Sequence, residues 1–177
     1  ANNTASVSIA IPLAAVLTAT GRGIAAIAPG ESAQEVFRVK LRNIAAAPET
    51  LTALSLGNAT QGPGTQAQLD AEWSALTLTA LHGGAPVATG VATFSAGAAF
   101  FPNLIAAIPS GDSLEIVLFG SATAVARDGD TLDLEIAGPS ALGFASPVTL
   151  RTQWPVVPAG FFLVDGMTAS QIAVHPE

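Results

Sequence analysis

The chain of 177 residues contains no cysteine and no tyrosine, and only two histidines, His82 and His175. Without cysteine, neither a disulfide framework nor a thiolate metal site can form. A metal site built on both histidines would need a third ligand and their close approach. His82 precedes a Gly-Gly turn signal and His175 lies near the end of the sequence, so we interpret both as exposed polar residues. The sequence therefore predicts no cofactor, and calcium is the only metal that it leaves open.

Charge of either sign is also scarce. Charged residues make up 11% of the chain and the formal net charge is −7, whereas ordinary globular proteins are roughly 25% charged. Nucleic acid is excluded as a partner, because its binding needs clustered Lys and Arg that displace counterions. Arg38, Lys40 and Arg42 do alternate along one face of a predicted strand. We interpret them as a solvated face that discourages edge pairing, with a phosphate site as the less favoured alternative.

The chain also lacks an uninterrupted run of apolar residues long enough for a membrane helix. Residues 7–28 are strongly apolar, but Pro12, Gly21 and Arg22 interrupt them, and a spanning helix needs about 20 apolar residues. We therefore expect no membrane span. The low lysine content and the bias toward Ala, Thr, Ser and Gly predict an exported protein, extracellular or on the cell surface. Ala1 is the kind of small residue that signal-peptide cleavage leaves, although a boundary within a longer protein explains it nearly as well.

What the chain does contain is a turn pattern that occurs three times. Gly30, Gly111 and Gly129 are each followed by an acidic residue, then by a hydroxyl residue, and then by alternating apolar residues. A turn that repeatedly leads into a half-buried strand is typical of antiparallel sandwiches. The predicted fold is all-β, an antiparallel β-sandwich of Ig-like or jelly-roll-like type that a strand donated by a neighbouring chain could complete.

Alternation of apolar and polar residues defines the individual strands. It is clearest in residues 35–41 and 131–136, where apolar side chains occupy one face and charged side chains the other. The loop of residues 57–70 is polar and rich in Gly and Pro, and residues 66–73 could form one helical turn. The predicted strands are 5–11, 15–20, 24–28, 34–42, 50–57, 73–81, 86–95, 112–119, 131–137 and 147–154.

The two ends of the chain suggest a mode of assembly. We divide the sequence into an N-terminal strand segment (1–28), a β-sandwich core (29–154) and a C-terminal linker and tail (155–177). Both ends carry short alternating apolar segments that could add a strand to the open edge of a neighbouring copy. A head-to-tail contact of this kind repeats into an open filament. The residues predicted to mediate it are Val7, Ile9, Ile11, Ile172 and Val174.

Few residues form a recognisable chemical motif. Asp128, Asp130 and Asp133 lie near a turn, where carboxylates can bind Ca²⁺. The EF-hand spacing is absent, and we favour a turn-capping role for them. No nucleophile elbow, phosphate loop or dinucleotide fingerprint occurs, and we expect the carboxylates mostly in turns and on outer strand faces. The sequence therefore predicts that the protein is not an enzyme.

The two tryptophans and two asparagines have alternative interpretations. Trp73 and Trp154 could form a pair on which sugar rings stack, or they could close the open ends of a sandwich core, and we favour the core. Asn2 and Asn58 begin Asn-x-Thr sequences. These are glycosylation acceptors where the source glycosylates and the sites are exposed.

Three segments carry a resemblance to a known class of domain: residues 36–43 (VFRVKLRN), 51–56 (LTALSL) and 108–113 (IPSGDS). They resemble the immunoglobulin-like or fibronectin-type-III-like repeats of large bacterial and archaeal surface proteins. Residues 164–172 also resemble a segment that links such domains. The antibody-type cysteine pair and the tyrosine corner are absent. The resemblance implies a largely non-enzymatic β-sandwich of the kind that builds stalks, layers, adhesins and filaments.

These observations lead to two main functional hypotheses. The first is a structural subunit of an extracellular filament, pilus or surface layer, whose partners are copies of itself joined by strand donation. The alternative is a carbohydrate-binding or adhesive module of a larger secreted protein, with cell-surface or matrix polysaccharide as its partner. That alternative predicts that Trp73 or Trp154 is exposed. A capsid or decoration protein of similar fold is a third hypothesis.

Overall fold

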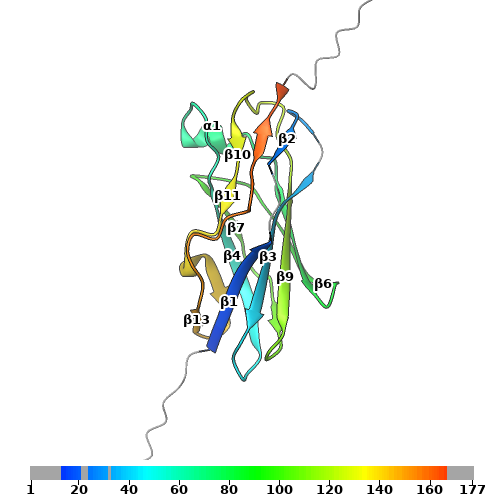
Figure 1. Ribbon diagram of the computed structural model, residues 1–177, viewed down its shortest axis with the longest axis vertical. Helices are drawn as coiled ribbons and strands as arrows, with labels where there is room; N and C mark the ends of the chain where they lie inside the picture. Colours follow the sequence, from blue (N-terminus) through cyan, green and yellow to red (C-terminus); the bar gives the residue numbers. More distant parts are fainter. Residues whose placement is uncertain (1–12, 21–23, 32, 167–177) are drawn as a thin grey trace, which may run out of the picture.

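The computed structural model describes residues 13–20, 24–31 and 33–166, which form a predominantly β structure (Figure 1). The all-β prediction is confirmed. The strands are β1 (Leu13–Thr20), β2 (Ala25–Ile27), β3 (Gln34–Asn43), β4 (Glu49–Asn58), β5 (Leu76–His82), β6 (Ala85–Ala92), β7 (Ala98–Phe101), β8 (Ala106–Ile108), β9 (Ser113–Gly120), β10 (Thr131–Leu132), β11 (Leu134–Glu135), β12 (Leu142–Phe144), β13 (Val148–Leu150) and β14 (Phe162–Val164). An α-helix, α1 (Gln66–Asp70), and a 3₁₀ turn, η1 (Pro139–Ala141), complete them.

The largest sheet has six strands in the order β13-β1-β3-β9-β5-β6. Its neighbouring strands run antiparallel, except that β1 and β13 are parallel. The register between β3 and β9 shifts between Glu35 and Phe37. A bulge turns two consecutive side chains toward one side, which explains why Val36 and Phe37 are both buried. Beyond the bulge the alternation predicted for residues 35–41 holds.

A second sheet is organised around β4, which pairs with β11 and β12 and also with β7 and β8. A third, smaller sheet has the order β10-β14-β2, with β14 parallel to β2. Strands β1 and β2 fall in the predicted N-terminal segment, and β14 falls in the predicted tail. All three pair with strands of their own chain.

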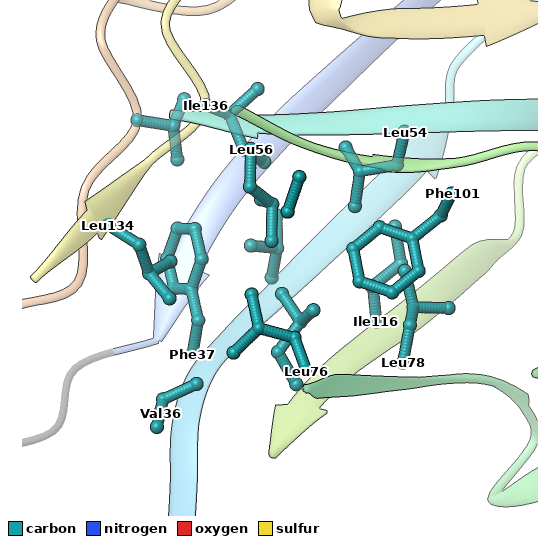
Figure 2. Close-up of a cluster of buried hydrophobic side chains, with 14 of the residues drawn as sticks. Val36, Phe37, Leu54, Leu56, Leu76, Leu78, Phe101, Ile116, Leu134 and Ile136 are labelled. Atoms are coloured by element: carbon teal, nitrogen blue, oxygen red, sulfur yellow. The ribbon is translucent and has the colours of Figure 1, made fainter. Parts of the chain in front are cut away.

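One apolar core joins the sheets, because their inward-facing side chains belong to a single buried cluster. Figure 2 shows side chains from β3, β4, β5, β7 and β9 packed together, among them Phe37, Leu54, Leu76, Phe101 and Ile116. None of these five is more than 2% exposed. Burying one such side chain contributes roughly 1.5–3 kcal/mol, so the larger residues supply what the abundant alanines cannot.

The longer alternating segments match the sequence predictions, and several of the short strands do not. Leu132, Leu134 and Ile136 are buried as predicted, at 0–1% exposure. Four strands were not predicted: β7, β8, β12 and β14. Each has three or four residues, which is too short for alternation to be distinguished from chance. The strand predicted at residues 5–11 lies outside the described residues.

The helical turn predicted within residues 66–73 is confirmed as α1. Thr65 caps its N-terminus in a capping box with Gln68, whose side-chain Oε1 accepts a hydrogen bond from Thr65 N at 2.9 Å. Within the described ranges, no helix is long and apolar enough to cross a membrane.

Candidate functional site

Polar side chains are buried where the end of α1 meets β4 and the β6–β7 turn. Asp70, the last residue of α1, is 7% exposed. Its Oδ1 accepts hydrogen bonds from Asn58 Nδ2 at 2.8 Å and Gln66 Nε2 at 2.9 Å, and its Oδ2 accepts one from Gly97 N at 2.9 Å. Burial opposes the ionisation of Asp70, but these hydrogen bonds, led by that from Gly97, outweigh it and hold the pKa of Asp70 below its ordinary value. Asp70 is therefore a charged carboxylate at neutral pH.

A pocket of about 350 Å³ opens beside this carboxylate. Asp70 and Ala67 of α1 line one part of it, and Trp73, Phe94 and Ala96 line another. The rings of Trp73 and Phe94 are tilted by 52° with centroids 6.0 Å apart, an arrangement that aromatic pairs favour. The pocket thus combines a fixed negative charge with an apolar, aromatic wall.

Hydrogen bonds connect the aromatic wall to the carboxylate. Trp73 Nε1 donates to Thr60 Oγ1 at 2.8 Å, and Thr60 N donates to Asn58 Oδ1 at 3.1 Å. Asn58 in turn donates to Asp70. Because each polar group in this series has a partner, the positions of the tryptophan and the carboxylate are coupled and well defined.

The turn that forms the pocket's other wall has an unusual backbone. Ser95 and Ala98 exchange backbone hydrogen bonds of 2.9 and 3.1 Å, and the two residues between them, Ala96 and Gly97, have φ of 51° and 80°. Two positive φ values define a type I′ turn, in which Asn-Gly is the preferred sequence. Alanine in this region is strained. The strained turn directs Gly97 N toward Asp70.

A second buried charged group lies on the other side of α1. Glu72, which follows the helix, is 1% exposed. Its Oε1 accepts from Arg127 Nε at 2.7 Å and lies 2.6 Å from Arg127 Nη2. Arg127 Nη2 also lies 3.0 Å from Asp130 Oδ2. One guanidinium group therefore forms ion pairs with two buried carboxylates. We call Glu72, Arg127 and Asp130 the Glu72 cluster.

The Glu72 cluster is short of positive charge. Within the described part of the chain, Glu72 Oε2 and Asp130 Oδ2 are buried without an aligned hydrogen-bond donor. Burial raises the pKa of Glu72 above its ordinary value, Arg127 opposes the rise, and Asp130 adds to it. Glu72 therefore binds a proton more readily than an exposed glutamate does.

Close backbone packing fixes the Glu72 cluster in place. A Cβ atom at Gly62 would overlap the carboxyl group of Asp130, and one at Gly64 would lie 2.6 Å from Arg127 Nη1. The glycine-rich loop before α1 is therefore held against the Glu72 cluster. A smaller pocket of about 210 Å³ opens beside Arg127, Gln68 and Val125.

The three calcium candidates do not form one ligand set. Asp128 Oδ1 accepts from Gly166 N at 2.9 Å, and Asp133 Oδ1 accepts from Leu134 N at 2.8 Å. Asp130 belongs to the Glu72 cluster. Across the described residues, no group of three or more His, Cys, Asp or Glu side chains is placed to hold a metal ion.

Some of the other predicted site residues lie in the part of the chain that the structure describes, and the rest lie outside it. Asn58 Nδ2, the atom that a glycan would occupy, already donates to Asp70. His82 is half-exposed at the β5–β6 hairpin, with Nε2 2.7 Å from Asp112 Oδ2. The residues that lie outside the described ranges are Asn2, Val7, Ile9, Ile11, Ile172, Val174 and His175.

The tryptophans do not form an exposed pair. Trp73 is 4% exposed within the core, and Trp154 is partly buried against that core. A sugar ring needs an open aromatic face, which Trp73 does not offer. Trp73 lies in the core, as favoured from the sequence, and Trp154 packs against that core while partly exposed.

Sequence reasoning missed the residues that build this site, namely Asp70, Glu72 and Arg127. The sequence predicts carboxylates mostly in turns and on outer strand faces, whereas Asp70, Glu72 and Asp130 are all at most 7% exposed. The spacing of Arg127 and Asp130 by three residues around a Gly turn was the one available signal. It could not reveal Glu72, which is 55 positions away from Arg127.

Comparison with family models and with curated proteins does not assign the chain to a family. No family model matches it, and no curated protein matches it. Among solved structures, similarity is found to that of AvmM, described as catalysing macrocyclization in alchivemycin A biosynthesis. The sequences are 12% identical, the alignment covers 92% of each chain, and the TM-score is 0.38.

This comparison corrects two sequence predictions. The similar structure is that of a biosynthetic catalyst and not of a filament subunit or adhesive module, so the filament hypothesis with its binding-module alternative is contradicted, as is the prediction that the protein is not an enzyme. A likeness of this size carries no argument for a particular reaction.

Proposed function

We propose that the chain is a β-sandwich domain of immunoglobulin-like type, exported from the cell, that binds a small organic cation in the pocket beside α1. The sandwich assignment is supported by the two larger sheets, which contribute to one core. Export is supported by the low charge and lysine content. Loops at the end of a rigid scaffold commonly carry binding function.

The observation that carries this proposal is the charged carboxylate of Asp70 in the wall of an aromatic-lined pocket. Asp70 Oδ1 accepts two hydrogen bonds from the protein, whereas Oδ2 accepts one. A carboxylate oxygen has two lone-pair positions, so Oδ2 retains capacity for a donor from a ligand. A charged donor forms a stronger hydrogen bond with a carboxylate than a neutral donor does.

The rest of the pocket defines the ligand further. Trp73 and Phe94 provide an apolar wall, and aromatic rings also attract cations. The volume of about 350 Å³ is at the lower end of the roughly 300–1,000 Å³ range of small-molecule sites. The net charge of −7 favours the approach of cations over anions. A primary or secondary amine with a small apolar or aromatic body fits these features.

Binding of 2-phenylethylamine tests this proposal, with the neutral isostere 2-phenylethanol as the ligand control. In a Trp154→Phe background, tryptophan fluorescence reports on Trp73 alone. Ala67→Leu fills the pocket from the exposed side of α1 and keeps a good helix former. Ala46→Leu, at another exposed alanine, is the matched control, and circular dichroism checks the fold of each variant.

We expect the amine to bind with a Kd below about 1 mM and the alcohol to bind about tenfold more weakly. Ala67→Leu should weaken the amine about tenfold, and Ala46→Leu should leave its binding unchanged. Equal binding of amine and alcohol would show that Asp70 does not recognise the ligand. An absence of saturable signal with either compound would overturn the proposal.

A further inference from the structure

The basic residues of this acidic chain gather on one face of the largest sheet. The chain has six Lys and Arg residues in all, and three of them, Arg38, Lys40 and Arg42, alternate along the outer face of β3. The residues between them, Val39 and Leu41, are fully buried. The sequence pattern alone favours a solvated face. The structure adds a further cation from a distant part of the chain.

Arg151 joins this face from the end of β13. Its backbone N donates to Ala15 O of β1 at 2.8 Å, directly after the registered pair of Ala15 and Leu150. Arg151 is therefore beside Val16, and Val16 is paired on its other side with Arg42 of β3. Neighbouring strands are about 5 Å apart, so two long guanidinium side chains flank Val16 and can converge above it.

The acidic groups on this face are already engaged by another arginine. Arg38 binds Glu35, with Nε and Nη2 at 2.9 and 2.7 Å from its two carboxylate oxygens, and its Nη1 lies 2.8 Å from Glu115 Oε2. Among the residues that the structure describes, no ion pair involves Arg42 or Arg151. These two arginines are thus positive groups that have no counter-ion from the described chain.

A pocket of about 430 Å³ lies beside Arg151, between the second half of β1 and residues 151–157. Thr18, Thr152 and Gln153 line it together with Arg151, and each offers a side-chain hydrogen-bond donor. Thr152 Oγ1 accepts from Leu17 N at 2.8 Å, which leaves its O–H free to point away from β1. Guanidinium, hydroxyl and amide donors around one pocket are the groups that bind an oxyanion.

We propose that Arg42 and Arg151, together with Thr18 and Thr152, bind the oxyanion group of a small organic molecule, a phosphate ester or a carboxylate. A long polyanion does not fit, because in the described part of the chain the lysines and arginines without an ion pair are Arg42, Arg151 and the neighbouring Lys40, and the net charge of −7 repels an extended negative chain. This site goes beyond the proposed amine pocket and shares no lining residue with it.

The test is a titration of the whole chain with phenyl phosphate and with benzoate at constant ionic strength, followed by the NMR signals of the arginine Nε–H groups. The two compounds distinguish a phosphate from a carboxylate ligand. The variants are Arg42→Gln and Arg151→Gln. Arg38→Gln is the matched control, because Arg38 lies on the same face but is neutralised by Glu35 and Glu115.

We expect saturable shifts at Arg42 and Arg151 with a Kd below about 1 mM for the preferred anion, and about fivefold weaker binding in each of the two variants. Arg38→Gln should change the Kd by less than about twofold. If neither anion produces saturable shifts, the proposal fails. If Arg38→Gln weakens binding as much as Arg151→Gln does, the anion responds only to the general charge of the face, and the specific site is likewise refuted.

Discussion

Replacing Arg127 with methionine should destabilise the fold strongly, because Glu72 and Asp130 would lose the guanidinium group they share. Their side chains are 1% and 4% exposed, so neither carboxylate can recover its hydration without opening the structure. Removing one partner of a fully buried ion pair costs about 3–5 kcal/mol. The Arg127 side chain is itself 33% exposed, and water reaches that side, so we expect about 2–4 kcal/mol.

The physical cause can be isolated with a double-mutant cycle in urea. Glu72→Gln removes one of the two buried negative charges, keeps the shape of the side chain and supplies an amide N–H donor toward Asp130. In the Arg127→Met background it should therefore recover about 1–2 kcal/mol, and the difference between this effect and that of Glu72→Gln in the wild-type background is the coupling energy of the pair. Arg151→Met, at an exposed arginine, should stay within about 0.5 kcal/mol of the wild type. A loss below about 1 kcal/mol for Arg127→Met, or a coupling near zero, would refute this reasoning.

Three further predictions concern the same end of the molecule. The folded-state pKa of Glu72 is raised above its ordinary 4.5, so the contribution of Glu72 to stability is complete below pH 4.5 and is lost as the pH rises through the folded-state pKa. Urea midpoints measured from about pH 5 to 9 should show this decline in the wild type. The Glu72→Gln variant should show a flatter pH dependence. Ala96→Asn creates the Asn-Gly sequence that suits a type I′ turn, so thermal unfolding should show a gain of about 0.5–1 kcal/mol, and a loss would contradict the assigned strain. Gly62→Ala should cost about 1–3 kcal/mol in urea because its Cβ overlaps Asp130, whereas Gly138→Ala, with no atom within 4 Å, should be nearly neutral.

The long strands were predictable from sequence because burial of one sheet face imposes a period of two. That constraint acts along most of β3, β5 and β9, so the local sequence pattern was sufficient to predict these strands. Strands β7 and β8 are specified instead by pairing with β4, which lies more than 40 positions away at the registered pairs Leu54–Phe101 and Leu51–Ala106. No local sequence pattern indicates such a distant strand pairing.

The candidate site was less predictable than the fold, for a related reason. Asp70 and Glu72 read as ordinary surface carboxylates, since both follow a polar, glycine-rich loop. Their burial depends on Gly97 and Arg127, which come from other parts of the chain. The cluster could be inferred only after those segments were placed beside α1, because the energy of a buried charge is decided by its partners in space.

The distribution of buried polar groups argues that the α1 end carries the function. Six polar or charged residues are buried among those described, and four of them, Thr60, Asp70, Glu72 and Asp130, lie around α1. Burying charged groups is costly even when they are paired, and apolar residues of similar size are often more stabilising. A region selected for stability alone would not concentrate these groups beside a pocket and a strained turn. The energetic cost of burying these carboxylates at the α1 end is expected if they are held there to contact a ligand. Asp70 has this position in the proposed site.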